Sequence, residues 1–342
     1  MHQKPTMSDV ARLAGVGTMT VSRVLSGTVP VSEETARRVH KAIEQLQYRR
    51  NELARAFRGQ RSRTIGLIIP YLYDPFFANC AHAVTTIAKE NGYSVIITTS
   101  DENPDSEYLQ AEQMLQRHVD GLVVIPAQRR ESRLTRAMFG RTPVVVFDRP
   151  VSDLAFDVVL VQNTTGSRRM TEHLIEHGHQ RINFMGLSRK LFTINARFQG
   201  YRRAMQDAGL QIASFFGCDS QDDTLQAVQQ SLSGTKPPTA IITSNTLATR
   251  YVLSALSNLG VKIPTDIAFA GFDDFDMAEF TSPPLTVVRQ PALEMGRTAT
   301  NLLFDRIARG ELPQTGSRIV LPVEIVLRRS CGCKNRTPVV IH

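Results

Sequence analysis

From residue 64 onward the chain alternates short apolar runs with longer segments of helical pattern, and this alternation limits its fold more than any other feature. The apolar runs are residues 65–69, 95–97, 121–125, 144–147, 182–184, 240–242 and 267–270. The helical segments between them include residues 77–91, 105–118, 164–177, 197–208 and 246–259. Continuously apolar strands that alternate with helices are typical of a parallel sheet covered on both faces. Because the series repeats after about residue 160, we expect two doubly wound α/β lobes.

Polar and aromatic side chains follow several of these runs, at the point where each strand would end. They are Tyr73, Asp74, Phe76, Phe77, Asp148, Arg149, Asp273 and Asp274. Ligands of open α/β sheets bind beyond the carboxyl ends of the strands, so two facing lobes would hold a ligand in the cleft between them. Aromatic faces, carboxylates and guanidinium groups suit a sugar. Any one of these residues alone is more often an ordinary loop residue, but together they predict a sugar-type site.

The segment before the lobes predicts a pair of short helices joined by a tight turn. Val10, Leu13 and Ala14 fall at helical spacing, and Gly15 supplies the corner. Thr6 or Ser8 is expected to cap the first helix. The alternative is an ordinary helical hairpin at the edge of a core.

The second helix of this pair would begin at Thr18 and present polar residues outward, as a recognition helix does. Its inner face would hold Val21, Val24 and Leu25, and its outer face Thr18, Met19, Ser22 and Arg23. A third helix follows, with Ser32 as its N-cap and an apolar face of Val39, Ile43 and Leu46. We expect a three-helix unit over residues 5–47.

The positive charge of the chain is concentrated in its first 63 residues. These residues hold 12 Lys and Arg against 5 Asp and Glu, a net charge of +7, whereas the whole chain of 342 residues has a net charge of +8. The other residues therefore hold 28 against 27, a net charge of +1. Surface charge kept only for solubility would not be segregated in this way. A basic patch on a helix-turn-helix segment indicates a protein that binds nucleic acid.

Other sites and locations are less favoured by the sequence. The N-terminus has no apolar signal region and no run approaches a membrane-spanning length, so we expect a cytoplasmic protein that does not contact a membrane. Cys331 and Cys333 have a spacing that does not match a zinc knuckle, and we interpret them as a feature of the C-terminal tail. No serine or cysteine nucleophile comes with a placed base, so we predict neither an enzyme nor a cofactor.

Several motifs resemble one known family, in the family's order and spacing. They include SDVARLAGVGTMTVSRVLSG, VSEETARRVHKAIEQLQY, SRTIGLIIP, RHVDGLVVIP, VVVFDR, HLIEHGHQRI, RFQGYRRAM, GVKIPTDIAFAGFDD and PPLTVVRQP. Over essentially its full length the chain resembles bacterial transcription regulators of the lactose-repressor/galactose-repressor (LacI/GalR) family. The resemblance implies a dimer or tetramer that binds a pseudo-palindromic operator, with lobes like those of periplasmic sugar-binding proteins. In that family HLIEHGH is ordinary sequence, so we expect no metal at His173, His177 and His179.

The resemblance also implies the residues that contact DNA. Thr18, Met19, Ser22 and Arg23 would face base edges, Arg23 would pair with guanine, and Thr20 would contact phosphate. A hinge helix would begin at Asn51 and insert Phe57 into the minor groove, flanked by Arg55 and Arg58. The alternative is that Phe57 packs on the effector domain. The family's usual proline before the hinge is Arg50 here.

In the cleft, the resemblance implies ten effector-binding residues: Asp74, Phe76, Phe77, Asp148, Arg149, Thr193, Arg197, Asn245, Asp273 and Gln290. The family often has an aspartate where this chain has Asn245. Arg189 and Lys190 lie in the loop expected to enter the cleft. One acid fewer and two added cations favour an anionic effector, a sugar acid or a sugar phosphate, although both cations could equally be solvated.

The boundaries expected from these features are a helix-turn-helix domain at 5–50, a hinge at 51–63 and an effector-binding and dimerisation domain at 64–330. The chain should cross between the lobes near residues 160 and 290. We predict a dimeric repressor, with a preference for dimer over tetramer because no C-terminal heptad run is evident. Alternatives are an enzyme or a sugar-binding module on the same lobes, and an architectural DNA binder without a working effector switch.

Overall fold

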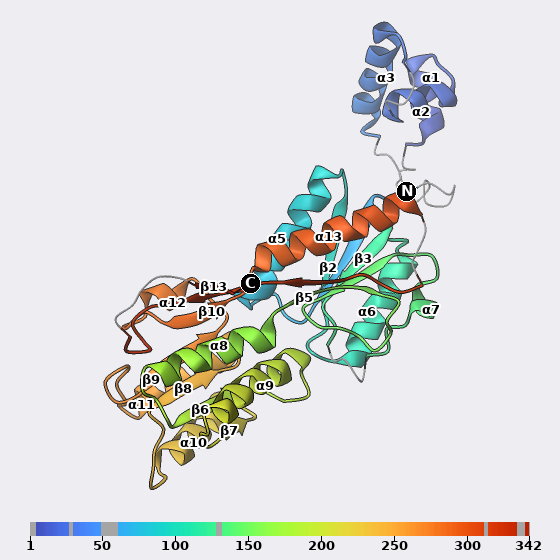
Figure 1. Cartoon of the computed structure of the whole chain (residues 1–342). Helices are drawn as coiled ribbons and strands as arrows, with labels where there is room; N and C mark the ends of the chain where they lie inside the picture. The colour runs from blue at the N-terminus through green and yellow to red at the C-terminus, as the bar shows by residue number, and fades with distance from the viewer. Residues whose placement is uncertain are drawn as a thin grey trace. The chain divides into compact units, whose positions relative to one another are not determined.

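The computed structural model of the chain describes residues 5–26, 30–48, 61–127, 132–310, 314–333 and 339–341 (Figure 1). It divides into two compact units, residues 1–62 and 63–342. The first unit carries the three predicted helices, and the second carries two sheets with helices on both faces. The predicted fold class is confirmed. Among the described residues, no helix is long and apolar enough to cross a membrane.

The small unit consists of α1 (Met7–Ala14), α2 (Thr18–Ser26) and α3 (Glu33–Leu46). Thr6 caps α1, since its hydroxyl accepts the Asp9 N–H while the Asp9 carboxylate accepts the Thr6 N–H. Gly15 ends the helix at φ +65°, a left-handed conformation that favours glycine. The buried side chains of this unit are Val10, Ala11, Ala14, Val21, Val39 and Ala42.

One residue of the expected apolar face lies outside this core. Leu13 is at helical spacing with Val10 and Ala14, yet it is 49% exposed. The core of so small a three-helix unit buries few side chains. The apolar face of α1 is therefore only partly covered, and Leu13 lies on its uncovered side.

The first lobe is a parallel six-stranded sheet in the order β11-β5-β4-β3-β1-β2. Its strands are β1 (Thr64–Ile69), β2 (Ser94–Thr99), β3 (Gly121–Val124), β4 (Val144–Phe147), β5 (Asp157–Val161) and β11 (Arg318–Leu321). Its helices are α5 (Pro75–Glu90), α6 (Pro104–Gln116), α7 (Arg136–Phe139) and α13 (Ala292–Arg309). Helices α5 and α13 pack against each other on one face of the sheet, and α6 covers the other.

The second lobe is a seven-stranded sheet in the order β13-β12-β10-β9-β8-β6-β7. Its strands are β6 (Ile182–Gly186), β7 (Ala213–Phe216), β8 (Ala240–Thr243), β9 (Ala268–Phe272), β10 (Thr286–Arg289), β12 (Val323–Val326) and β13 (Val339–Ile341). Its helices are α8 (Asn163–Glu176), α9 (Phe192–Asp207), α10 (Gln221–Leu232), α11 (Thr246–Asn258) and α12 (Met277–Phe280).

Three features of the lobes differ from the sequence prediction. The chain changes sheet three times, after β5, after β10 and after β11, whereas we expected two crossings. Strand β12 is antiparallel to β10 because the chain enters the second lobe from the carboxyl edge of the first sheet and can only run back. Strand β13 pairs with β12 and carries the sheet past residue 330, the predicted end of the domain.

Candidate functional site

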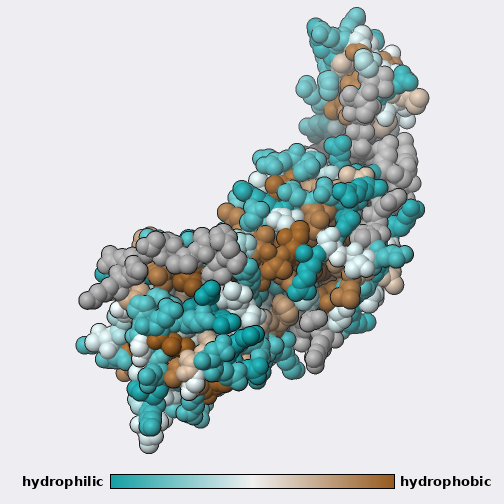
Figure 2. All heavy atoms as spheres, viewed as in Figure 1, coloured by the Kyte–Doolittle hydropathy of each residue, from teal (hydrophilic) through white to brown (hydrophobic). Residues whose placement is uncertain are grey.

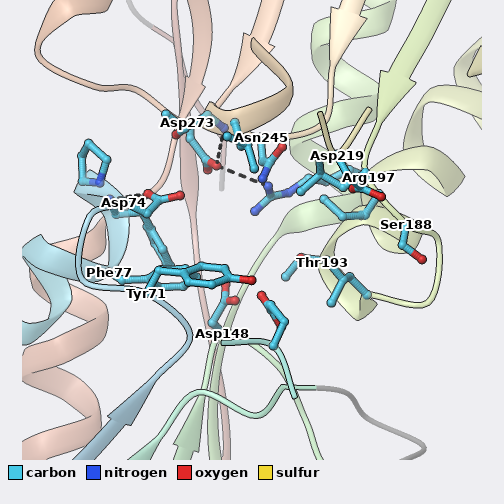
Figure 3. Close-up of a pocket in the computed structure, with 18 of the residues that line it drawn as sticks. Tyr71, Asp74, Phe77, Asp148, Ser188, Thr193, Arg197, Asp219, Asn245 and Asp273 are labelled. Atoms are coloured by element: carbon cyan, nitrogen blue, oxygen red, sulfur yellow. Dashed lines mark hydrogen bonds and ion pairs between the residues drawn. The ribbon is translucent and has the colours of Figure 1, made fainter. Parts of the chain in front are cut away.

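A cavity of about 370 Å³ lies between the carboxyl ends of the two sheets (Figure 3). All ten residues that the resemblance assigns to effector binding line it. The first lobe contributes side chains that follow β1, β2 and β4, and the second lobe contributes side chains that follow β6, β7, β8 and β9. The ends of strands far apart in the sequence thus meet at one place, as the topology of facing α/β lobes requires.

Two buried aspartates occupy equivalent positions on the two walls of the cavity. Asp148 directly follows β4 and Asp273 directly follows β9, and both have a left-handed backbone, with φ of +64° and +77°. Each backbone N–H is held by a neighbouring strand, by the Val159 oxygen at 2.8 Å and the Val288 oxygen at 2.9 Å. Non-glycine residues in this conformation are strained and gather at functional sites. The same strained turn therefore aims a carboxylate into the cavity from each lobe.

On the first wall, Arg149 is fully engaged by protein groups. Its guanidinium donates to both carboxylate oxygens of Glu102, at 2.5 and 2.8 Å, and to Asp148 at 3.2 Å. It also donates to the carbonyl oxygens of Pro126 and Ala127. Burial by itself lowers the pKa of Arg149, but the Glu102 and Asp148 carboxylates outweigh it and raise that pKa. This arginine is a fixed part of the wall.

The acids of the first wall lie in a poorly hydrated and crowded region. Burial, reinforced by the negative charge of Asp273, raises the pKa of Asp74 to about 6, although the Phe76 N–H that it accepts opposes the shift. Burial also raises the pKa of Asp148, against the opposing effect of Arg149. Carboxyl groups held in this way favour neutral hydroxyl partners over further anions.

On the second wall, Arg197 projects from α9 and is less fully engaged. Its Nε donates to Asn163 at 2.8 Å and its Nη1 to the Ser244 oxygen at 2.7 Å, with Asp273 at 3.5 Å. Its guanidinium carbon lies 3.8 Å from the centre of the Phe272 ring. Burial lowers the pKa of Arg197. The nearby carboxylates raise that pKa, but they offset the effect of burial only in part.

The position of Arg197 depends on a close approach of two helices. At Gly200, one turn further along α9, a Cβ atom would lie only 2.2 Å from the Thr164 oxygen of α8. Glycine therefore lets α9 rest against α8, which brings Arg197 within reach of Asn163.

Besides the Thr246 hydroxyl, two buried acceptor oxygens in the cavity have no partner among the described residues. They are Oδ1 of Asp148 and Oε1 of Gln290, whose residues are 3% and 7% exposed. The Gln290 amide nitrogen already donates to Asp273. Asn245 caps α11, since its side-chain oxygen accepts the Ala248 N–H at 3.1 Å. A buried acceptor without a donor is costly, so these two oxygens are suited to receive hydroxyl groups of a ligand.

Several lining residues were missed by the sequence prediction. They are Tyr71, Glu102, Ser188, Asp219, Arg250 and Tyr251. Glu102 and Asp219 follow β2 and β7, strands towards the edges of their sheets, and β7 itself was not predicted. Glu102 could have been found from its place after the run 95–97, because the same rule identified Asp148.

Two residues near the predicted site do not line this cavity. Arg189 stacks on Phe198 at 4.6 Å and on Phe216 at 5.3 Å, so only its neighbour Lys190 faces the cavity. Asp274 is bound by Arg289 at 2.7 Å and Arg328 at 2.9 Å, and it does not line this cavity.

The predicted recognition helix has the expected outer face. Thr18, Met19 and Arg23 are exposed on α2, and Thr20 and Ser22 are half-buried. The exposed fraction of Met19 is 70%. The predicted hinge residues Asn51, Arg55, Phe57 and Arg58 lie outside the described residues.

Two family models match the chain. The model for bacterial regulatory proteins of the lacI family matches residues 6–51, and the model for a periplasmic binding protein-like domain matches residues 171–331. A repressor of Haemophilus influenzae, the HTH-type transcriptional repressor PurR, is 32% identical over 331 residues, 95% of this chain and 98% of that protein. The PurR repressor of Histophilus somni is also 32% identical, over 329 residues, 95% of this chain and 98% of that protein.

Solved structures with the same architecture cover nearly the whole chain. A complex of the transcriptional regulator CelR with cellobiose is 30% identical, with a TM-score of 0.70, and covers 95% of this chain and 99% of that one. The lac repressor dimer bound to operator and the anti-inducer ONPF is 24% identical, with a TM-score of 0.84. That match covers 96% of this chain and 99% of that one. At that identity the second match supports the fold alone.

Proposed function

Because this chain belongs to the LacI family of bacterial regulatory proteins, we propose that it is a homodimeric repressor whose operator affinity is set by a sugar-type effector bound between its lobes. The chain is a DNA-binding repressor of this family. The observation that carries the effector part of the proposal is the pair of strained, buried aspartates that enter one cavity from opposite lobes.

The chemistry of the first wall favours the hydroxyl groups of a sugar. Asp148 offers a buried oxygen without a partner, and Gln290, which directly follows β10, offers another. Tyr71 and Phe77 add aromatic faces on which the apolar side of a sugar ring can stack. Arg149 holds Asp148 in place without using that oxygen.

The second wall favours a negative charge on the effector. Lys190 and Arg250 line it, and neither side chain is in an ion pair with any residue that the structure describes. Arg197, whose buried charge is only partly compensated, lines the same cavity. We therefore place a carboxylate or phosphate of a sugar acid or sugar phosphate at this wall. Because Arg189 is stacked on Phe198, the proposal rests on Lys190 and Arg250.

For the DNA side, we assign Thr18, Met19, Ser22 and Arg23 to base edges and Thr20 to phosphate. The exposure of the outer face of α2 supports this assignment. A bidentate arginine–guanine pair is worth about 1–3 kcal/mol of discrimination between bases. We assign Asn51, Arg55, Phe57 and Arg58 to a hinge that contacts the minor groove. The helix-turn-helix domain keeps its predicted bounds of 5–50 and the hinge its bounds of 51–63, and the effector-binding domain begins at residue 64.

Dimer formation is supported by apolar side chains left on the surface of the large unit. Figure 2 shows apolar residues gathered over the region of α5 and α13. Among the large apolar residues that are exposed, Leu293 lies on α13, whereas Leu72 and Tyr73 precede α5 and Met277 and Phe280 lie on α12. A surface of this kind marks a contact with another protein, and in this family we assign the contact to a second copy of the chain.

Effector binding would control DNA binding by changing how far the lobes close. The three connections that follow β5, β10 and β11 are the places where the lobes can rotate. Closure in both protomers changes the spacing of their hinges, and such coupling is typically worth about 1–3 kcal/mol.

The test is fluorescence anisotropy of the full-length protein on DNA from upstream of its own gene, at fixed salt. The ligand panel contains neutral sugars, sugar acids, sugar phosphates and, because the cavity has aromatic faces, purine bases. A shift in DNA affinity with a sugar acid or phosphate alone supports the proposal. A shift with a purine base alone contradicts the sugar assignment, and specific DNA binding that no compound changes contradicts the effector switch.

A further inference from the structure

A side-chain cluster outside the effector cavity holds three groups that bind soft metal ions. Cys331, Cys333 and His173 each offer one ligand atom, and these atoms all lie within 4.8 Å of one another. The two sulfur atoms are 2.7 Å apart. The sequence prediction treated the cysteines as part of the tail and the histidine as ordinary family sequence. The structure corrects the first interpretation, since both cysteines are buried in the core of the second lobe.

The cysteines are held on a rigid support. Ser330, which precedes them, is fully buried, and its hydroxyl donates to the Phe269 oxygen and accepts the Thr286 N–H, both at 2.7 Å. The Ser330 oxygen also accepts the Phe269 N–H at 2.8 Å. These bonds fix the segment to the first residues of β9 and β10, the end of the sheet opposite the effector cavity. A metal site needs ligands positioned in this way by their surroundings.

The turn between the cysteines brings both sulfurs to one side. Gly332 adopts φ +75°, a left-handed conformation that favours glycine. The Cys331 sulfur lies 3.7 Å and the Cys333 sulfur 3.9 Å from the same oxygen, that of Arg328. The two thiols therefore converge on one point, as the two arms of a chelate do.

The third residue of the cluster, His173, lies on helix α8. Its Nε2 atom is buried and has no hydrogen-bond partner among the described residues. Buried polar atoms in native proteins are normally satisfied, so an unpartnered ring nitrogen beside two thiols points to a missing partner. A metal ion would supply that partner.

From this geometry we propose that Cys331, Cys333 and His173 bind one Zn²⁺ ion, with a water molecule as the fourth ligand. Two thiolates and a neutral imidazole balance the divalent charge, so the buried complex carries no net charge. Zinc–sulfur bonds of about 2.3 Å in tetrahedral geometry place the sulfurs about 3.8 Å apart. Zinc binding therefore requires the two sulfurs to move apart from 2.7 Å.

The site would join the C-terminal segment to α8. Binding that requires the folded arrangement of segments so distant in sequence stabilises the folded state. The proposal is independent of the effector function, since its residues do not line the effector cavity.

The experiment starts with full-length protein that has been reduced and treated with a chelator. Zn²⁺ is titrated against a chromophoric competitor, and Co²⁺ serves as a spectroscopic probe for thiolate ligation. We expect one zinc ion per chain and thiolate-to-cobalt absorption. Each of three substitutions should weaken zinc binding by at least about 100-fold: Cys331→Ser, Cys333→Ser and His173→Gln. Loss of a residue that only hydrogen-bonds to a metal ligand already costs up to about 100-fold, and loss of a ligand should cost no less.

Two matched controls should bind zinc as the natural chain does. His177→Ala removes the neighbouring histidine of the same helix, whose ring centre lies 4.3 Å from that of His173. Cys218→Ala removes a buried thiol of the same lobe. Should a variant fail to fold, the natural chain remains decisive, because zinc should raise its Tm and a chelator should reverse the rise.

Two results would overturn the proposal. One is the absence of stoichiometric zinc binding by the reduced natural chain. If the mass of that chain also falls by two hydrogens on oxidation, the two cysteines form a disulfide pair instead. The other is undiminished binding by the three ligand variants.

Discussion

The two walls of the effector cavity each carry a buried arginine. The two arginines differ in how well nearby protein groups compensate their positive charge. Arg149 has both oxygens of Glu102, Asp148 and two backbone carbonyl oxygens. Arg197 has one amide, one carbonyl and a more distant carboxylate at 3.5 Å. The pKa of Arg149 is raised and that of Arg197 is lowered.

This difference separates a wall that is already complete from one that needs a ligand. A fully bonded arginine orients its neighbours and gains little from a new acceptor. A buried arginine with too few acceptors gains more from an anion or a hydroxyl oxygen. We infer that Arg149 acts by positioning Asp148 and that Arg197 contacts the effector.

The largest expected effect is on stability, from breaking the complete wall. Arg149→Met should lower the free energy of unfolding by about 3–5 kcal/mol, because it leaves Glu102 and Asp148 without their cation in a buried site. Denaturant unfolding at pH 7 measures the change. A loss below about 1 kcal/mol would show that the network around Arg149 is not tightly coupled.

The second effect should appear in binding more than in stability. Arg197→Met should weaken effector affinity on the order of 100-fold, equivalent to about 2.7 kcal/mol, and destabilise the fold less than Arg149→Met. Titration calorimetry together with unfolding separates the two quantities. The inferred difference between the walls fails if Arg197→Met costs more stability than Arg149→Met and leaves effector affinity unchanged.

The third effect depends on pH. The folded-state pKa of Asp74 is raised to about 6 from 3.8, so its contribution to stability is fully present below pH 4 and is lost as the pH rises through 6. Asp74→Asn keeps an acceptor for the Phe76 N–H and removes this loss. The variant should be more stable than the natural chain by about 1–2 kcal/mol at pH 7, with no such gain at pH 4. An equal difference at both pH values would contradict the account.

The smallest effect should discriminate between effectors. Lys190→Ala should weaken an anionic effector about tenfold, equivalent to about 1.4 kcal/mol, and leave its neutral counterpart unchanged. Arg189→Ala is the matched control, since Arg189 stacks on Phe198 outside the cavity. Equal losses for the charged and neutral ligands would remove Lys190 from the anion site.

The sequence predicted best those features that depend on neighbouring residues. Thr6, Gly15 and Ser32 act through local capping geometry, and the helices that they bound form where expected. The ten cavity residues were assigned because parallel strands end at a common edge and because the family resemblance supplied the rest. Local pattern and the family resemblance were therefore needed together to find the cavity.

Features that depend on distant contacts escaped prediction. Glu102 becomes part of the site only through Arg149, which lies on a different loop. The meeting of His173 with Cys331 requires the third crossing between the lobes, and that crossing follows a short strand, β11, with alternating exposure. Arg189 was placed only in a loop expected to enter the cleft. Its stacking on Phe198 and Phe216 could not be predicted, because those residues are not adjacent to it in sequence.

The central claim is that the cavity and the operator-binding unit are coupled, and linkage gives the most direct test. Once the effector is known, its dissociation constant is measured on the full-length protein alone and on the protein saturated with operator DNA. Coupling is reciprocal, so the fold-change in effector affinity caused by DNA must equal the fold-change in DNA affinity caused by effector, between about 5- and 150-fold. Effector affinity that operator DNA leaves unchanged would contradict the account.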